Sequence, residues 1–250
     1  MPRQLRFGIA IVASEPPEDF IQTVRLAEES GFDSIWVPDY RLYRDVYVSL
    51  TLAALNTSRV RLGCAVTNPY TRHPALTAVG IASVDALSNG RAVLGACVEA
   101  ALAAVGNGAW GVKRARETLE MVCWLQGCAV SDDRTEALKA VKPAAALTLG
   151  HAPDWTLEAM EIDESDVREI RKVYYTDGAR AAAELVTDEM AEKYTIARTP
   201  EHAVRKIKRL RAQGFDEIIF LPDESGGNAR KAMRTLRDRV IAPLRTGEST

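Results

Sequence analysis

The sequence predicts an α/β protein of the (β/α)8 TIM-barrel type, with the barrel incomplete. Three observations lead to this prediction. Short, nearly all-apolar segments alternate with longer amphipathic ones as far as residue 126, the alternation then stops, and one clear strand–helix pair returns near the carboxyl end. Nearly all-apolar strands that alternate with helices require a parallel sheet covered by those helices.

Four strands and four helices are expected in the regular part of the chain. The strands are short, rich in β-branched residues and bounded by turn formers, at 6–13, 34–39, 60–68 and 91–98. The helices are expected over 16–32, 46–58, 73–90 and 113–126, and the first of them has apolar residues at helical spacing. Two of these helices have proline near their start and glycine near their end, as helix termini favour.

The second half of the chain departs from this pattern. Residues 127–133 predict a short strand, 134–211 are expected to be almost wholly helical, 215–223 form a strand, and 227–244 form the closing helix. A full barrel needs eight strands, so we expect strands 5 and 6 to be missing. We predict a single domain over 1–250, with regular βα units in 1–126, a mainly helical part in 127–211 and the last strand–helix unit in 212–250.

A doubly wound sheet would show the same alternation of strands and helices. Its dinucleotide-binding members carry a G-x-G-x-x-G motif after the first strand. The segment "GIAIVASEPP" at that place holds a single glycine, Gly8. The barrel is therefore favoured.

Composition excludes several classes of protein. The 250 residues are 47% hydrophobic and 26% charged, and 32 Lys plus Arg against 34 Asp plus Glu argue against a nucleic-acid binder. No apolar stretch approaches the length of a membrane span, about 20 residues. The four cysteines form no CxxC pair and there are only three histidines, so no metal site is expected. We expect a cytoplasmic enzyme or binding protein, with reduced thiols.

Polar side chains gather where the expected strands end, which is where parallel α/β folds place their ligand sites. They are Asp39 after the second strand, the run 66–74 after the third, Glu99 after the fourth, and 223–227 after the last. We therefore expect a ligand pocket at this end of the sheet.

Each of these groups also has a structural interpretation. Asp39 and His73 are placed to cap helices, and Arg72 binds a phosphate or pairs with an acid. Gly226 and Gly227 hold an anion on free backbone N–H groups or form an ordinary turn. The tryptophans are expected to be core residues rather than stacking platforms.

Several motifs resemble those of a known family. They are the Trp-x-x-Asp end of the second strand, "LNTSRVRLG" (55–63), "VTNPYTRHP" (66–74), "LSNGRAVLG" (87–95) and, near the end, "TPEHAVRKIKRLRAQGFDEIIFLP" (199–222). Together they resemble the luciferase-like monooxygenase superfamily and are most similar to its methylenetetrahydromethanopterin-reductase-like branch.

The resemblance implies a barrel that binds FMN or 8-hydroxy-5-deazaflavin (coenzyme F-420) and moves hydride between the cofactor and a small organic substrate. It implies a homodimer formed by the helices that follow the second and third strands. It also implies a non-prolyl cis peptide near Cys64, Ala65 and Val66, with Thr67 and Asn68 on the cofactor rim.

The resemblance, together with the missing strands 5 and 6, leads us to predict roles for the polar strand ends. Asp39 and Glu99 would be the catalytic acids, and Arg72 or the N–H groups of Gly226 and Gly227 would hold the cofactor phosphate. Asp39 would orient the substrate and take a proton.

Three departures from the family pattern support a second interpretation. Strands 5 and 6 are missing between Gln126 and Ala129, Tyr40 stands where the family has histidine, and Cys97 stands where it has glycine. The alternative is a truncated, non-catalytic homologue that binds a flavin-like ligand or acts as an assembly partner.

Overall fold

The computed structural model describes residues 4–40, 43–67, 72–96, 120–152, 154–159, 161–222 and 229–246. The chain divides into two compact units. Unit 1 comprises Met1–Cys123 and Arg211–Ile219, and unit 2 comprises Trp124–Leu210 and Phe220–Thr250. The single-domain organisation expected from the sequence stays a prediction.

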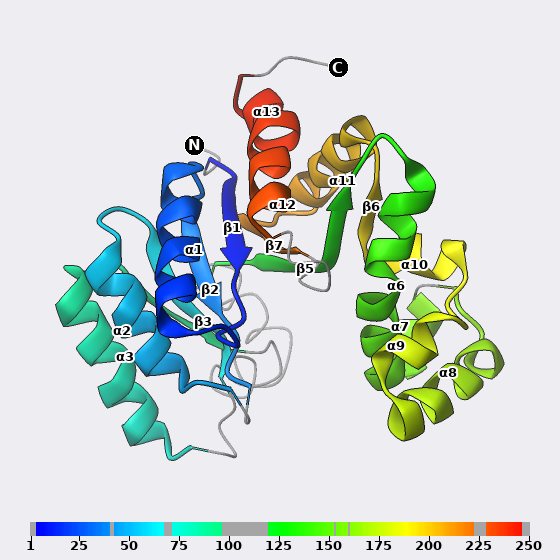
Figure 1. The fold of residues 1–250 in the computed structure, drawn as a ribbon, viewed down its shortest axis with the longest axis horizontal. Helices are drawn as coiled ribbons and strands as arrows, with labels where there is room; N and C mark the ends of the chain where they lie inside the picture. Colours follow the sequence, from blue (N-terminus) through cyan, green and yellow to red (C-terminus); the bar gives the residue numbers. More distant parts are fainter. Residues whose placement is uncertain are drawn as a thin grey trace. The chain divides into compact units, whose positions relative to one another are not determined.

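Unit 1 is built from parallel strands and the helices that connect them (Figure 1). Its elements are β1 (Arg6–Ala10), α1 (Pro17–Glu29), β2 (Ser34–Val37), α2 (Val46–Asn56), β3 (Arg61–Thr67), α3 (Pro74–Ser88), β4 (Ala92–Ala96) and the first half of β7 (Glu217–Pro222). The strand order is β4-β3-β2-β1-β7, and β1 to β4 pair in parallel. The predicted parallel α/β organisation is confirmed, as is the adjacency of the first four strands and the last one.

Local sequence fixes the ends of the unit 1 helices. Asp45 caps α2 by accepting hydrogen bonds from the backbone N–H groups of Tyr47 and Val48. His73 caps α3 through Nδ1, as one of its two interpretations predicted, and a proline follows in the first turn. The left-handed residue Asn89 ends α3.

The two faces of the unit 1 sheet differ in composition. On one face the strands carry buried apolar side chains such as Phe7, Ile9, Ile35 and Leu62, typical of a face covered by helices. The alternate positions on β1 to β4 carry glycines, a tryptophan and charged residues. These alternate positions form the second face of the sheet.

Unit 2 is mainly helical. Its elements are β5 (Val122–Val130), α6 (Arg134–His151), α7 (Asp154–Ala159), α8 (Glu164–Asp177), α9 (Ala179–Ala183), α10 (Asp188–Tyr194), β6 (Ile196–Arg198), α11 (Pro200–Ala212), the second half of β7, α12 (Ala229–Leu236), a π-helical turn (Arg237–Ile241) and α13 (Ala242–Thr246). The strand order is β7-β5-β6, with β5 and β6 parallel.

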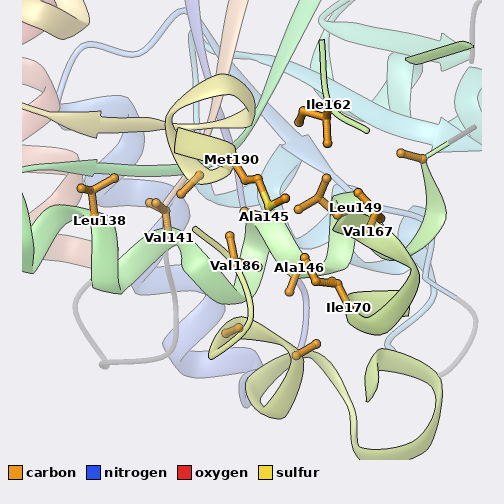
Figure 2. Packing of buried hydrophobic residues seen from close by; sticks show 14 of the residues in the cluster. Leu138, Val141, Ala145, Ala146, Leu149, Ile162, Val167, Ile170, Val186 and Met190 are labelled. Carbon is orange, nitrogen blue, oxygen red and sulfur yellow. The ribbon is translucent and has the colours of Figure 1, made fainter. Parts of the chain in front are cut away.

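The helices of unit 2 share a hydrophobic core of their own. Figure 2 shows Leu138, Val141, Ala145 and Leu149 along α6 among apolar residues of the neighbouring helices, Met190 included. Their spacing of three and four residues forms one continuous face of α6. Because many of the core residues are alanines, the helix backbones can pack closely.

Two predictions for the chain beyond residue 112 were wrong. The helix expected over 113–126 is a strand from Val122 onward, and this strand also covers most of the segment expected to begin at residue 127. Met121 shows the reason, because its backbone N–H donates to Asp216 Oδ2 at 2.9 Å and its carbonyl accepts from Asp216 N at 2.7 Å. These contacts place the segment beside β7, and such tertiary pairing overrides local helix preference. The three-residue strand β6 was also missed within a segment expected to be helical.

Within the described residues, no helix is long and apolar enough to cross a membrane.

Candidate functional site

The candidate site lies at the carboxyl ends of β2 and β3. Asp39 follows β2 by two residues, and Thr67 is the last residue of β3. The Thr67 hydroxyl donates a hydrogen bond to Asp39 Oδ2 at 3.1 Å. Asp39 is therefore held at the strand ends by Thr67 and does not cap a helix. Among the described residues, its second carboxylate oxygen has no hydrogen bond.

An irregularity of β3 shapes this site. The β3–β4 register shifts between Cys64 and Thr67, and the Ala65–Val66 peptide bond is cis, where the resemblance places such a bond. Ala65 is buried, but the Val66 side chain is 50% exposed. The bulge therefore presents an apolar side chain to the surface, next to the Asp39–Thr67 pair.

Two tyrosines add further apolar surface near Asp39. Tyr40 and Tyr43 are 41% and 50% exposed, and their ring centroids lie 5.7 Å apart. Exposed aromatic and aliphatic groups beside a carboxylate form the mixed surface that ligand sites commonly use.

Arg72 makes contacts with α2. Its Nη2 donates to Asp45 Oδ2 at 2.5 Å, and its guanidinium lies 4.7 Å from the centre of the Tyr47 ring. The hydrogen bond that Arg72 donates to Asp45 raises the pKa of Arg72. Burial alone would raise the pKa of Asp45, but the Arg72 hydrogen bond and two backbone N–H groups lower it overall. Arg72 thus pairs with an acid, as one of its two interpretations predicted, and its role in phosphate binding stays a prediction.

Two ionisable groups are buried below the bulge. Burial raises the pKa of Cys64, whose side chain is fully buried, and it also raises the pKa of Tyr47. The Tyr47 hydroxyl is buried, and side-chain hydrogen bonding with Thr77 and Thr67 offsets part of the rise in its pKa. Both groups are therefore neutral at physiological pH.

Four of the predicted site residues lie outside the described residues. They are Glu99, Asn68, Gly226 and Gly227. Their predicted roles, and the pairing of Asp39 with Glu99, stay predictions. Cys64, Ala65, Val66, Thr67 and Asp39 do lie together at the ends of β2 and β3.

Sequence reasoning missed Asp45 and Tyr47. An available signal for Asp45 was its position directly before the apolar helix that begins at Val46, where Asp is a preferred capping residue. Tyr47 had no comparable signal, because a tyrosine in an apolar helix is usually a core residue.

Unit 2 contains a separate cleft of about 420 Å3 between the end of β5, α6 and α12. Arg239 donates to both carboxylate oxygens of Asp132 at its rim, at 2.8 and 2.9 Å. Across the parts of the chain that the structure describes, no group of His, Cys, Asp or Glu side chains could hold a metal ion.

A family model and several relatives match the amino-terminal half of the chain. The luciferase-like monooxygenase family model matches residues 4–125. Over 91 residues the chain is 47% identical to the 5,10-methylenetetrahydromethanopterin reductase of Methanolobus tindarius, a match that covers 36% of this chain and 28% of the relative. The chain therefore spans less than a third of the length of that relative.

Solved structures extend the likeness to nearly the whole chain. The coenzyme F420-dependent tetrahydromethanopterin reductase of Methanopyrus kandleri superposes with a TM-score of 0.82 at 21% identity, covering 96% of this chain and 99% of that one. An FMN-bound Baeyer–Villiger monooxygenase component from Pseudomonas putida has a TM-score of 0.58 at 11% identity, covering 97% and 99%. These likenesses show the fold. In its amino-terminal half, over residues 4–125, the chain is therefore similar to the luciferase-like monooxygenase family.

Proposed function

We propose that this protein is an oxidoreductase that uses a deazaflavin or FMN to transfer hydride to or from a small organic substrate. The observation that carries the proposal is the Asp39–Thr67 pair beside the half-exposed Val66 of the β3 bulge. The names of the matched proteins support it, because they include coenzyme F420-dependent enzymes and an FMN-bound monooxygenase component. The coenzyme F420-dependent reductase and dehydrogenase among the matched proteins favour the deazaflavin over FMN.

The residues present fit the ring of such a cofactor. Val66 offers an exposed apolar contact at the bulge, and Tyr40 and Tyr43 extend this apolar surface. When bound, the ring would supply the hydride chemistry. The phosphate would have to be held by residues other than Arg72 unless the Arg72–Asp45 pair opens.

The chain itself contributes the handling of a proton. Thr67 fixes one oxygen of the Asp39 carboxylate, which leaves the second oxygen to orient a substrate and to accept or return a proton. A positioned general acid or base of this kind contributes about 100-fold or more to turnover.

The first test is cofactor binding, followed by an Asp39→Asn variant. The purified protein is titrated with coenzyme F420 and with FMN, and binding is followed by absorbance and fluorescence. We expect Asp39→Asn to lower turnover about 100-fold or more, with 5,10-methylenetetrahydromethanopterin as the trial substrate, and to leave the dissociation constant nearly unchanged. Asp238→Asn, at an exposed carboxylate paired with Arg237, is the control. Failure of the wild-type protein to bind either cofactor would refute the proposal, and binding without turnover would favour the non-catalytic homologue.

A second proposal is that two copies associate through α2 and α3. These helices carry exposed large apolar side chains, at Val48, Leu55, Leu76, Val79 and Leu87, each more than half exposed. Helices that are apolar all round are normally buried, and an exposed apolar patch marks an interface. A second copy is the favoured partner because the family resemblance implies a homodimer through the same helices.

Sedimentation tests this association. We expect the wild-type protein to sediment as a dimer at micromolar concentration. The double variant Leu76→Asp, Val79→Asp should sediment as a monomer, because it places charges on the exposed apolar face. A monomeric wild-type protein contradicts the proposal. The cytoplasm is the proposed location, in keeping with the buried free thiols of Cys64 and Cys128.

A further inference from the structure

The second face of the unit 1 sheet, opposite the buried apolar side chains, has three glycines on three different strands. Gly8, Gly63 and Gly95 belong to β1, β3 and β4. At each position a Cβ atom would overlap or crowd the indole of Trp36, which projects from β2. The three glycines thus form a cradle across the sheet, and a single side chain fills it.

The indole is anchored at the amino end of the same sheet. Trp36 Nε1 lies 2.7 Å from Glu217 Oε1 and 2.7 Å from the Ser34 hydroxyl oxygen. Ser34 also donates to Glu217 Oε1, and both residues are fully buried. These hydrogen bonds fix the plane of the ring.

Glu217 is in turn held by a group of paired charges. Its Oε2 accepts from Arg6 Nε at 3.2 Å and lies 3.6 Å from Arg61 Nη1. Glu120 binds Nη2 of both arginines at 2.9 Å. Two arginines are thus paired with two glutamates, and these contacts hold the Glu217 side chain in position beside the indole.

The far edge of the indole lies under the irregular part of β3. Gly63 and Gly95 both meet the six-membered ring of Trp36, and a Cβ on Gly95 would also meet the carbonyl oxygen of Cys64. Cys64 is the residue at which the β3–β4 register begins to shift. The indole therefore supports the backbone from which the bulge rises.

We propose that Trp36 is a positioning residue, oriented by Glu217, which holds the Cys64–Thr67 bulge in the shape on which the ligand ring rests. The ligand part of this inference depends on the proposed function. The support of the bulge by Trp36 does not, because every contact in it belongs to unit 1 and involves no ligand.

Two variants disturb the anchor in different ways. Trp36→Phe keeps an aromatic ring over the glycines but removes the N–H donor. Glu217→Gln leaves a side chain of the same size. Because both carboxylate oxygens accept hydrogen bonds, the amide must place its NH2 group against either the indole N–H or Arg6.

The matched control is Glu120→Gln. It removes the other carboxylate of the same charge group, which binds Arg6 and Arg61. A general weakening of the charge group would therefore appear in Glu120→Gln as well as in Glu217→Gln.

Amide hydrogen exchange, read by mass spectrometry on a peptide that contains residues 63–67, tests the support of the bulge without ligand. We expect both anchor variants to exchange about tenfold faster there, as expected for the loss of a buried hydrogen bond. Glu120→Gln should stay within about threefold of the wild type, and far-UV circular dichroism checks that each variant is folded. Wild-type exchange in the anchor variants, or equal acceleration in the control, overturns the proposal.

Titration with coenzyme F420 and FMN completes the experiment. We expect dissociation constants about tenfold higher in the two anchor variants and unchanged in the control. If the wild-type protein binds neither cofactor, the proposed function fails, and the exchange measurement alone still decides whether Trp36 supports the bulge. If the anchor variants exchange faster but bind the cofactors as tightly as the wild type, the ligand part of the inference is refuted.

Discussion

The amino and carboxyl ends of the unit 1 sheet both carry charged and hydroxyl side chains, but in different states of pairing. At the amino end, Arg6, Arg61, Glu120 and Glu217 bind one another, and Glu217 is completely buried. At the carboxyl end, Asp39 has a single hydrogen bond among the described residues.

Burial differs in the same way. The tryptophan at the amino side of the bulge is 3% exposed, and the valine on the bulge itself is 50% exposed. The charged side chains at the amino end therefore bind one another. At the carboxyl end, the Asp39 carboxylate and the exposed Val66 side chain are available to a ligand. A parallel α/β sheet can thus use one end for stability and the other for function.

The largest expected effect is the difference between removing an acid at each end. Glu217→Ala leaves Arg6 and Arg61 short of a buried partner and should lower the free energy of unfolding by about 3–5 kcal/mol. Asp39→Ala removes one hydrogen bond and should cost about 1 kcal/mol or less. Urea denaturation measures both. Equal costs would mean that the two ends do not differ in this way.

The next largest effect concerns the close packing of the strand glycines against Trp36, between the two ends of the sheet. Gly63→Ala places a methyl group against the Trp36 ring and should cost about 1–3 kcal/mol of unfolding free energy. In a Trp36→Ala background the same substitution should cost much less, because the ring that it meets is gone. A double-mutant cycle by urea denaturation measures the coupling, and additive costs would contradict the contact.

The smallest effect concerns the cap of α2 at the carboxyl end. Asp45→Ala should cost about 1 kcal/mol near neutral pH. The folded protein lowers the pKa of Asp45, so its stabilising effect is fully present above the unfolded-state value of about 3.9 and is lost as the pH falls through the lower folded-state value.

The pH dependence supplies the measurement. The difference in unfolding free energy between wild type and Asp45→Ala should shrink by at least half between about pH 6 and pH 2.5. A difference that is the same at both pH values would show that the Asp45 carboxylate is not what stabilises the start of α2.

Most of unit 1 could be predicted from the sequence, because periodicity and helix ends agree there. Pro17 and Pro74 mark helix starts, and the apolar strands β1 to β4 lie within the expected ranges. The strand at Val122 could not be predicted, since its apolar run fits a helix or a strand. What decides between them is pairing with the distant residue Asp216.

The candidate site was predictable only in part. The positions of Asp39 and Thr67 at strand ends follow from the alternation of strands and helices. The cradle around Trp36 does not, because Gly8, Gly63 and Gly95 each look like an ordinary strand glycine until strand register aligns them. Register between distant strands is information that local patterns do not contain.

The contact between Ser34 and Glu217 also has a kinetic consequence. These residues are 183 positions apart in the chain, and closing so long a loop is entropically costly and slow. The helices α6 to α10 bury their shared core within 134–194, so their contacts are local and should form early. Refolding should therefore show fast recovery of helical circular dichroism, followed by a slower change in tryptophan fluorescence as Glu217 reaches the Trp36 indole.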